Sequence, residues 1–268
     1  MDRLTESVYV NITGRGCNNG LVATSDGLVM IDTPMFPADA YALQKEIDKL
    51  GELRYIINTE PHVDHVSGAF FFPAPVIAHE GTRKAVLEAS VDQYREMLRR
   101  TDPQISLPEG YRYRPPTITL SDRLTVYLGD HTFEIVHMPG HSPFQVAVFV
   151  PEERVVFTSD NVTNGTPPFM HQALPLEWIQ SLERMLKLDA DKLVPGHGPV
   201  ADRAYLNDMI GVVKGATEIV WAALNNGMSL DEAQRTLSLF PGFPANERML
   251  QVQRMSIARL YEVLAKPK

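Results

Sequence analysis

A cluster of potential metal ligands is the feature that most constrains this sequence. Four ligand side chains occupy six consecutive positions, Glu60-Pro61-His62-Val63-Asp64-His65. The β-favouring run from Arg54 to Ile57 comes just before them, and Pro61 cannot donate to a strand ladder, so the strand is expected to end there. A loop with so many ligands in so few positions indicates a bound cation.

The spacing within this cluster favours more than one cation. In a locally extended loop Glu60 and His62 point to the same side, because side chains two positions apart share a face. Asp64 and His65 are consecutive and diverge. The arrangement therefore suits one metal ion for each pair.

Three further segments carry candidate ligands, and each follows a predicted strand. Loops at strand ends collect on one edge of a β-sandwich, where they can converge on a shared site. The segments are Pro139-Gly140-His141-Ser142 after strand 132–136, Ser159-Asp160-Asn161 after strand 155–158, and Pro195-Gly196-His197-Gly198-Pro199 after strand 192–194.

The remaining patterns predict an alternation of strands and helices. Further strands are expected at 7–12, 20–24, 28–31, 75–79, 124–128 and 145–150, with hairpins at 129–131 and 151–154. Helices are expected at 37–50, 81–100 and 176–188 and through the residues that follow 201. A proline-rich excursion from Pro103 to Pro116 is a candidate wall or lid of the pocket.

These motifs, in this order, resemble the metallo-β-lactamase-fold hydrolases, whose hallmark is HxHxDH followed by a histidine, a bridging aspartate and a last histidine. Asn18 or Asn19, with Val29-Met30-Ile31-Asp32-Thr33, is similar to the family's opening strands and their buried aspartate. The resemblance covers nearly the whole chain. It implies an α/β (α+β) fold, a four-layer αββα sandwich in a single domain over 1–268, with a helical C-terminal extension at approximately 201–268.

The resemblance also implies a ligand set for two divalent metal ions. It assigns the first metal to His62 and His141 and the second to Asp64, His65 and His197, with Asp160 as the bridge. Glu60 departs from the family, which has a histidine there. Two divalent cations, three carboxylates and one hydroxide sum to zero charge, where the usual set leaves +1. Zinc is expected, and the extra carboxylate makes manganese or iron credible; alternatively, Glu60 does not ligate and that site is weak or empty.

The chemistry that such a centre supports is hydrolysis. A bound cation lowers the pKa of water from 15.7 to about 7, and the resulting hydroxide attacks a carbonyl or phosphoryl centre. The resemblance implies that Asp64 orients this nucleophile and returns a proton to the leaving group. True β-lactamases of the superfamily generally lack the bridging aspartate, so the retained Asp160 favours a small ester, thioester or lactone as substrate.

Two other functions remain open at this point. The second hypothesis is an iron-dependent oxidoreductase of the same fold, similar to a persulfide dioxygenase. The extra carboxylate of Glu60 favours this hypothesis more than the usual histidine would. A non-catalytic binding relative is the third hypothesis, with Glu60 as a first sign of decay. The six other intact ligands argue against decay.

Composition restricts the partners. The formal net charge of −8 disfavours nucleic acid, and no apolar run approaches the roughly 18 to 20 residues of a membrane span. The start of the chain lacks the pattern of a secretory signal, and Cys17 is the only cysteine, so cytoplasmic residence is expected. The expected partner is a small-molecule substrate; the group Tyr94, Met97 and Leu98 is a candidate for core, lid or the contact of a homodimer.

Several other residues are expected to have ordinary roles. Cys17 should be a small buried side chain, and His137 structural. His79 and His131 should face solvent, and for His171 a surface position is slightly favoured over the pocket border. One helical face should belong to the core, and it is formed by Trp178, Ile179, Leu182 and Leu186. The segment from Ser229 to Glu232 fits a capping box at the start of a later helix.

Overall fold

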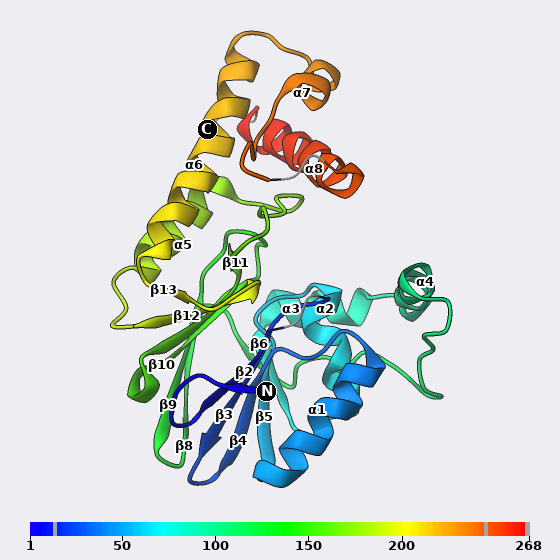
Figure 1. The fold of residues 1–268 in the computed structure, drawn as a ribbon, viewed down its shortest axis with the longest axis vertical. Helices are drawn as coiled ribbons and strands as arrows, with labels where there is room; N and C mark the ends of the chain where they lie inside the picture. Colours follow the sequence, from blue (N-terminus) through cyan, green and yellow to red (C-terminus); the bar gives the residue numbers. More distant parts are fainter. Residues whose placement is uncertain (13–14, 244–245, 266–268) are drawn as a thin grey trace.

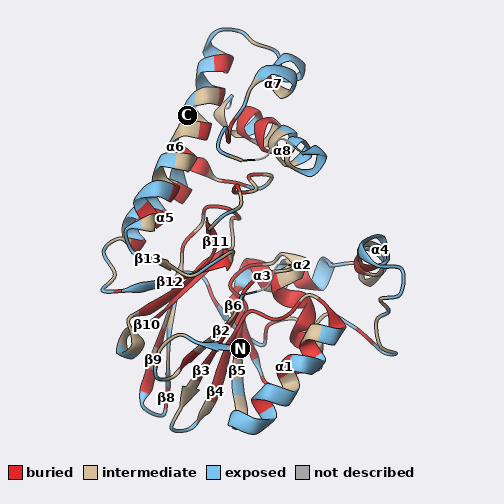
Figure 2. Ribbon diagram, viewed as in Figure 1, coloured by how far each residue is buried: buried red, intermediate tan, exposed pale blue. Residues whose placement is uncertain are grey.

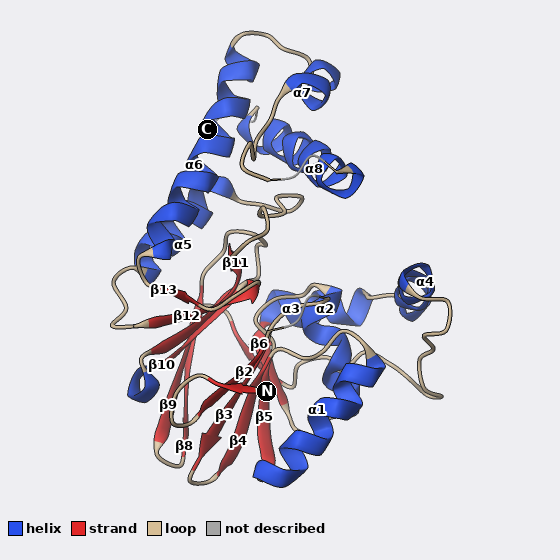
Figure 3. Cartoon of the chain, viewed as in Figure 1, coloured by secondary structure: helices blue, strands red, loops and turns tan. Residues whose placement is uncertain are grey.

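The computed structural model describes residues 1–12, 15–243 and 246–265, which form two β-sheets with helices (Figures 1 and 3). The first sheet has its seven strands in chain order, antiparallel from β1 to β4 and parallel from β4 to β7. Its strands are β1 (Asp2–Arg3), β2 (Val8–Asn11), β3 (Asn19–Thr24), β4 (Gly27–Ile31), β5 (Leu53–Ile57), β6 (Val76–His79) and β7 (Ile118–Leu120). The helical segments of this half are α1 (Pro37–Leu50), α2 (Val63–Val66), the 3₁₀ helix η1 (Ser67–Phe71), α3 (Glu80–Glu88) and α4 (Val91–Thr101).

The second sheet has six strands in the order β13-β12-β11-β10-β9-β8. Only β11 and β12 pair in parallel among these strands. The strands are β8 (Arg123–Leu128), β9 (His131–His137), β10 (Val146–Val150), β11 (Val155–Thr163), β12 (Lys192–His197) and β13 (Ala201–Asp202). The helices of this half are the 3₁₀ helix η2 (Pro151–Glu153), α5 (Pro175–Met185), α6 (Tyr205–Asn225), α7 (Leu230–Thr236) and α8 (Glu247–Leu264).

The two sheets pack face to face, and helices cover their outer faces. Strand β10 shows how: Val148 belongs to the cluster between the sheets, whereas Phe149 belongs to the cluster shared with the outer helices. Successive residues of a strand face opposite sides, so one apolar strand serves both layers. On the other outer face, Leu43 and Ile47 of α1 pack against Met30. The expected αββα sandwich is confirmed.

The C-terminal helices α6–α8 extend the layer outside the second sheet (Figure 1). Val213 of α6 and Leu260 of α8 belong to the same buried cluster as Trp178 of α5 and Val156 of β11. Figure 2 shows these buried faces turned toward one another. The helix α7 begins as expected, because the Ser229 hydroxyl accepts the Glu232 N–H at 3.2 Å.

Some local expectations were wrong. The helix expected at 81–100 is two helices, because the chain is extended at Ala89 and Ser90, and the Ser90 hydroxyl caps α4 by accepting the Gln93 N–H. The excursion 103–116 contributes none of the described residues that line the cavity below; its Tyr111 packs instead against Tyr94 of α4. No helix in the described residues is long and apolar enough to span a membrane.

His79 and His131 were expected to face solvent, and both are buried. His79 caps α3, since its Nδ1 accepts the Gly81 N–H at 3.0 Å, and its ring stacks on Phe144. His131 lies between Asp130 and Glu153, at 2.8 and 3.1 Å. A sequence pattern does not contain these long-range partners, which make burial of a polar ring tolerable.

Candidate metal centre

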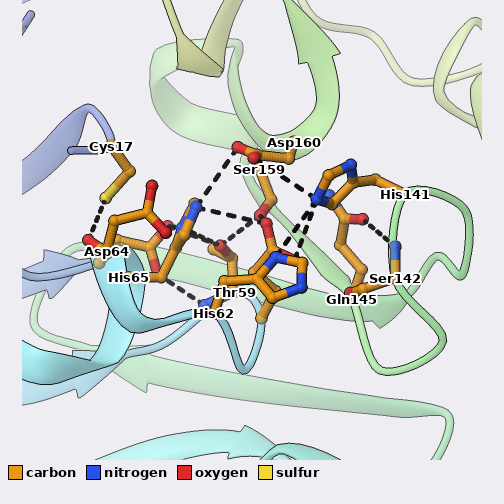
Figure 4. Close-up of polar contacts among 12 residues, drawn as sticks. Cys17, Thr59, His62, Asp64, His65, His141, Ser142, Gln145, Ser159 and Asp160 are labelled. Atoms are coloured by element: carbon orange, nitrogen blue, oxygen red, sulfur yellow. Dashed lines mark hydrogen bonds and ion pairs between the residues drawn. The ribbon is translucent and has the colours of Figure 1, made fainter. Parts of the chain in front are cut away.

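The segments with candidate ligands meet at one edge of the sandwich, as Figure 4 shows for most of them. Glu60 follows β5 and His141 follows β9, whereas His197 ends β12. Asp160 was expected just after a strand but lies within β11, which continues to Thr163. The strand is irregular here because Ser159 has a positive φ of 52° and the pairing with β12 shifts register. All seven predicted residues are brought together.

Glu60, His62 and His141 form the first group of ligand atoms. His62 Nδ1 lies 2.8 Å from Glu60 Oε2 and 3.2 Å from His141 Nε2. One ligand atom from each of the three residues lies within 4.8 Å of the others. A single cation could contact all three, because such ligands lie about 2.0–2.3 Å from a zinc ion.

Asp64, His65 and His197 form the second group, in which His197 Nε2 lies 3.3 Å from Asp64 Oδ2. Asp160 lies between the groups: its Oδ1 is 3.3 Å from His65 Nε2, and its Oδ2 is 3.6 Å from His141 Nε2. The ligand atoms thus divide into two sets that share a carboxylate.

The expected extended conformation of the 60–65 loop was only partly right. His62 is extended, but the helical turn α2 begins at Val63. This turn brings Asp64 and His65 to the same group of ligand atoms, where an extended chain would separate them.

Opposite charges balance within the site. The Asp160 carboxylate raises the pKa of His197 to about 10. Burial alone would lower the pKa of His62, but Glu60 raises it to about 9. Burial alone would raise the pKa of Glu60, but His62 and His141 lower it to about 2. The carboxylates of Glu60 and Asp160, which are buried, and of Asp64, which is partly buried, therefore stay ionised and need positive charge, which histidine protons or divalent cations can supply.

Asp32 orients His65 from behind the site. Its Oδ2 accepts from His65 Nδ1 at 2.9 Å, and Thr59 holds the same carboxylate through its N–H and its hydroxyl, at 2.7 and 2.5 Å. With the proton on Nδ1, the lone pair of His65 Nε2 faces Glu60 and Asp160. Carboxylates that fix a ligating histidine in this way are common around metal sites.

Glycine precedes the histidine in two of the loops because neighbouring side chains take the space of a Cβ atom. A Cβ at Gly196 would lie 1.8 Å from Asp160 Oδ1, and one at Gly140 would lie 2.2 Å from Asn161 Oδ1. The last loop is also tied to the start of the chain, since Asn18 Nδ2 donates to the carbonyls of Pro195 and Gly198.

Three residues near the site had no clear signal in the sequence. His171 was favoured as a surface residue, but it lines the cavity, and its ring centroid lies 5.1 Å from that of His62. Gln172 Oε1 lies 3.2 Å from His62 Nε2, so His62 Nδ1 is the ring nitrogen that faces the first group. Cys17 is buried as expected, but its thiol also donates to the Asp64 carbonyl at 3.0 Å. Tertiary packing alone places these residues.

The fold and this arrangement of ligands agree with the family comparison. The model of the metallo-beta-lactamase superfamily matches residues 12–197, and the chain belongs to that superfamily. The matched segment ends at the last histidine of the site.

Several characterised proteins are similar in sequence. The chain is 21% identical over 264 residues to a linear primary-alkylsulfatase from Pseudomonas sp. (strain ATCC 19151), covering 82% of this chain and 50% of the relative. It is 31% identical over 181 residues to the 2,4-dinitroanisole O-demethylase subunit alpha from Nocardioides sp. (strain JS1661), covering 64% of this chain and 49% of that relative. It is 25% identical over 209 residues to the human acyl-coenzyme A thioesterase MBLAC2, covering 69% of this chain and 74% of that relative. The chain thus spans about half the length of the first two relatives.

Solved structures share the fold. A metallo-beta-lactamase family protein from Thermus thermophilus matches with a TM-score of 0.73 at 19% identity, over 98% of this chain and 94% of that one. The sec-alkylsulfatase Pisa1 from Pseudomonas sp. matches with a TM-score of 0.73 at 17% identity, over 99% of this chain and 52% of that one. Both matches therefore include the C-terminal helices as well as the sandwich.

Proposed function

We propose that this chain is a metal-dependent hydrolase with a binuclear centre that acts on a small ester, thioester, lactone or related substrate. The observation that carries the proposal is the pair of ligand groups joined by Asp160. One cation would need only one such group, whereas two-metal hydrolytic sites hold their cations about 3.5–4 Å apart. Relatives named as an alkylsulfatase, a thioesterase and a hydroxyacylglutathione hydrolase support hydrolysis.

The residues fit divalent cations. Among the described residues, Glu60 Oε2, His65 Nε2 and Asp160 Oδ1 are buried without any hydrogen bond of good geometry. Such atoms are costly to bury unless a cation or another partner satisfies them. The first cation would be held by Glu60, His62 and His141. The second would be held by Asp64, His65 and His197, and Asp160 would be shared by both. When bound, the cations supply Lewis acidity, which acidifies water and polarises a substrate oxygen.

Glu60 is proposed as a second shared carboxylate. Its Oε2 lies beside His62, and its Oε1 lies 3.3 Å from His65 Nε2, so the two oxygens reach toward both ligand groups. The side chain has no exposed surface. The histidine found here elsewhere in the family would offer one ring nitrogen in place of two carboxylate oxygens, and it would not add the negative charge that Glu60 brings.

Replacing Glu60 by glutamine is expected to weaken metal binding by at least about 100-fold, because it removes a ligand charge from a buried site. Competition with a coloured chelator would measure the affinity of each metal. The matched variant Glu60→His should retain one metal per group, since it restores the family residue. Unchanged affinity in Glu60→Gln would show that Glu60 is not a ligand.

Asp64 is proposed to move a proton. It lines the cavity, and although burial alone would raise its pKa, His65 and His197 lower the pKa to about 2. The ionised carboxylate can accept a proton from the attacking water and return it to the leaving group. Asp64 would combine this role with ligation, and its Oδ2 contact with His197 fixes its orientation.

The metal content of protein purified without added metal is the first test. We expect near two zinc or manganese ions per chain by elemental mass spectrometry, and metal-dependent turnover of activated esters. About one iron per chain, with oxygen consumption, would instead favour an iron-dependent oxidoreductase. This second candidate is supported by Glu60, because carboxylates favour harder cations than imidazole does. Absence of tightly bound metal would contradict both and favour a binding protein.

A further inference from the structure

A cavity of about 570 Å³ opens beside the candidate metal centre. Its volume is in the range of small-molecule sites. Candidate ligands, including Asp64 and His197, form one side. The segment from Thr163 to Phe169 and the start of α8 form the others, the latter through Arg248, Met249 and Val252.

Arg248 is the only lysine or arginine among the described residues that line the cavity. It lies in the first turn of α8 and is exposed. Among the described residues, no carboxylate forms an ion pair with its guanidinium, and no acceptor forms a hydrogen bond with it. By contrast, Arg259 of the same helix is engaged with the Ala173 carbonyl and with Glu262. The Arg248 side chain is therefore available to a molecule in the cavity.

Contacts between α8 and the cavity wall hold the helix that carries Arg248. The Met170 N–H donates to Ser256 Oγ at 3.2 Å, and Arg259 Nε donates to the Ala173 carbonyl at 3.1 Å. Met170 and Ala173 flank His171, which lines the cavity. These hydrogen bonds connect α8 to the cavity wall, although α8 lies outside the segment 12–197 that the family model matches.

The cavity lining also includes apolar side chains, namely Phe169, Met249 and Val252. A substrate that meets all of these groups would place its scissile group at the metal centre and would also carry an apolar section and an anionic group that reaches Arg248. A guanidinium binds such oxyanions through paired N–H donors. The chain as a whole carries a formal charge of −8, so an anionic substrate needs a local cation to be retained.

We infer that Arg248 determines specificity by binding an oxyanion group of the substrate, remote from the bond that is hydrolysed. The inference rests on the proposed function and names the substrate class more closely: acid-bearing esters or thioesters. Arg248 contacts neither the reacting atoms nor the candidate ligands, so its effect should fall on substrate binding and not on the chemical step.

Two 4-nitrophenyl esters of equal chain length test this inference in metal-loaded protein, one with a terminal carboxylate and one with a terminal methyl group. Arg248→Ala should raise KM for the acid-bearing ester about 10- to 100-fold, as expected for loss of a charge-assisted hydrogen bond. It should leave kcat, metal content and the KM of the neutral ester unchanged. Arg248→Lys should recover part of the loss, and Arg254→Ala, an exposed arginine of α8 that does not line the cavity, should have no effect.

Calorimetric binding gives a readout that does not need turnover. The wild-type protein should bind a straight-chain dicarboxylate about tenfold or more tightly than the monocarboxylate of equal length, and Arg248→Ala should abolish the difference. A sulfonate in place of the far carboxylate distinguishes a tetrahedral from a planar oxyanion; a preference for either one that depends on Arg248 supports the inference. Equal binding of all probes, or equal effects of Arg248→Ala on both esters, would overturn it. Failure of metal-loaded protein to hydrolyse either ester would instead count against the proposed hydrolase.

Discussion

Replacing Asp160 with alanine is expected to lower turnover of activated esters by about 10³-fold or more and to reduce the bound metal. Asp160 contacts His65, His141 and His197, and so joins the two ligand groups. Metal ions contribute several kcal/mol to hydrolytic transition states, and each 1.36 kcal/mol is a factor of ten in rate. Elemental mass spectrometry and ester hydrolysis, measured on the same preparation, would follow both losses.

The controls separate this effect from unfolding. Asp160→Asn keeps the shape of the side chain and removes only its charge, so it should fold and still lose metal. Asp48→Ala alters an exposed aspartate of α1 and should behave as the wild type. If Asp160→Ala and Asp160→Asn both kept two metals and full activity, the binuclear proposal would be untenable.

Replacing Trp178 with alanine is expected to have the largest effect on stability. Trp178 is fully buried in α5, its Nε1 donates to the Asn161 carbonyl at 3.0 Å, and its ring lies 5.7 Å from that of His141. Removing a buried tryptophan costs about 3–5 kcal/mol, because a cavity replaces its contacts. Urea unfolding should show this fall in the free energy of unfolding, with a lower midpoint.

Trp221 offers the matched control for this variant. It lies on α6 and is 58% exposed, so Trp221→Ala should change the free energy of unfolding by less than about 0.5 kcal/mol. Because Trp178 also packs beside Gly140, its loss should loosen the His141 loop and weaken the first metal. Equal midpoints for the two variants would refute the structural role of Trp178.

Much of the fold could be predicted from the sequence. The helix α1 has the predicted bounds, and its buried Ala40, Leu43 and Ile47 have the predicted spacing, although Leu50 is exposed at its end. Strands near turn residues were also predicted within a few positions. Such features depend on neighbours in the chain, so local periodicity reveals them. The break between α3 and α4 was missed because Ser90 is compatible with a helix as well as with its start.

The candidate site divides in the same way. The residues that could meet at the centre follow from the sequence alone, because ligands at strand ends collect on one edge of a sandwich. The folded chain was needed to place His171 and Arg248 in the cavity wall and to show that the two oxygens of Glu60 reach toward both ligand groups. Those relations join segments far apart in the chain. They depend on packing between layers, which no local pattern of residues encodes.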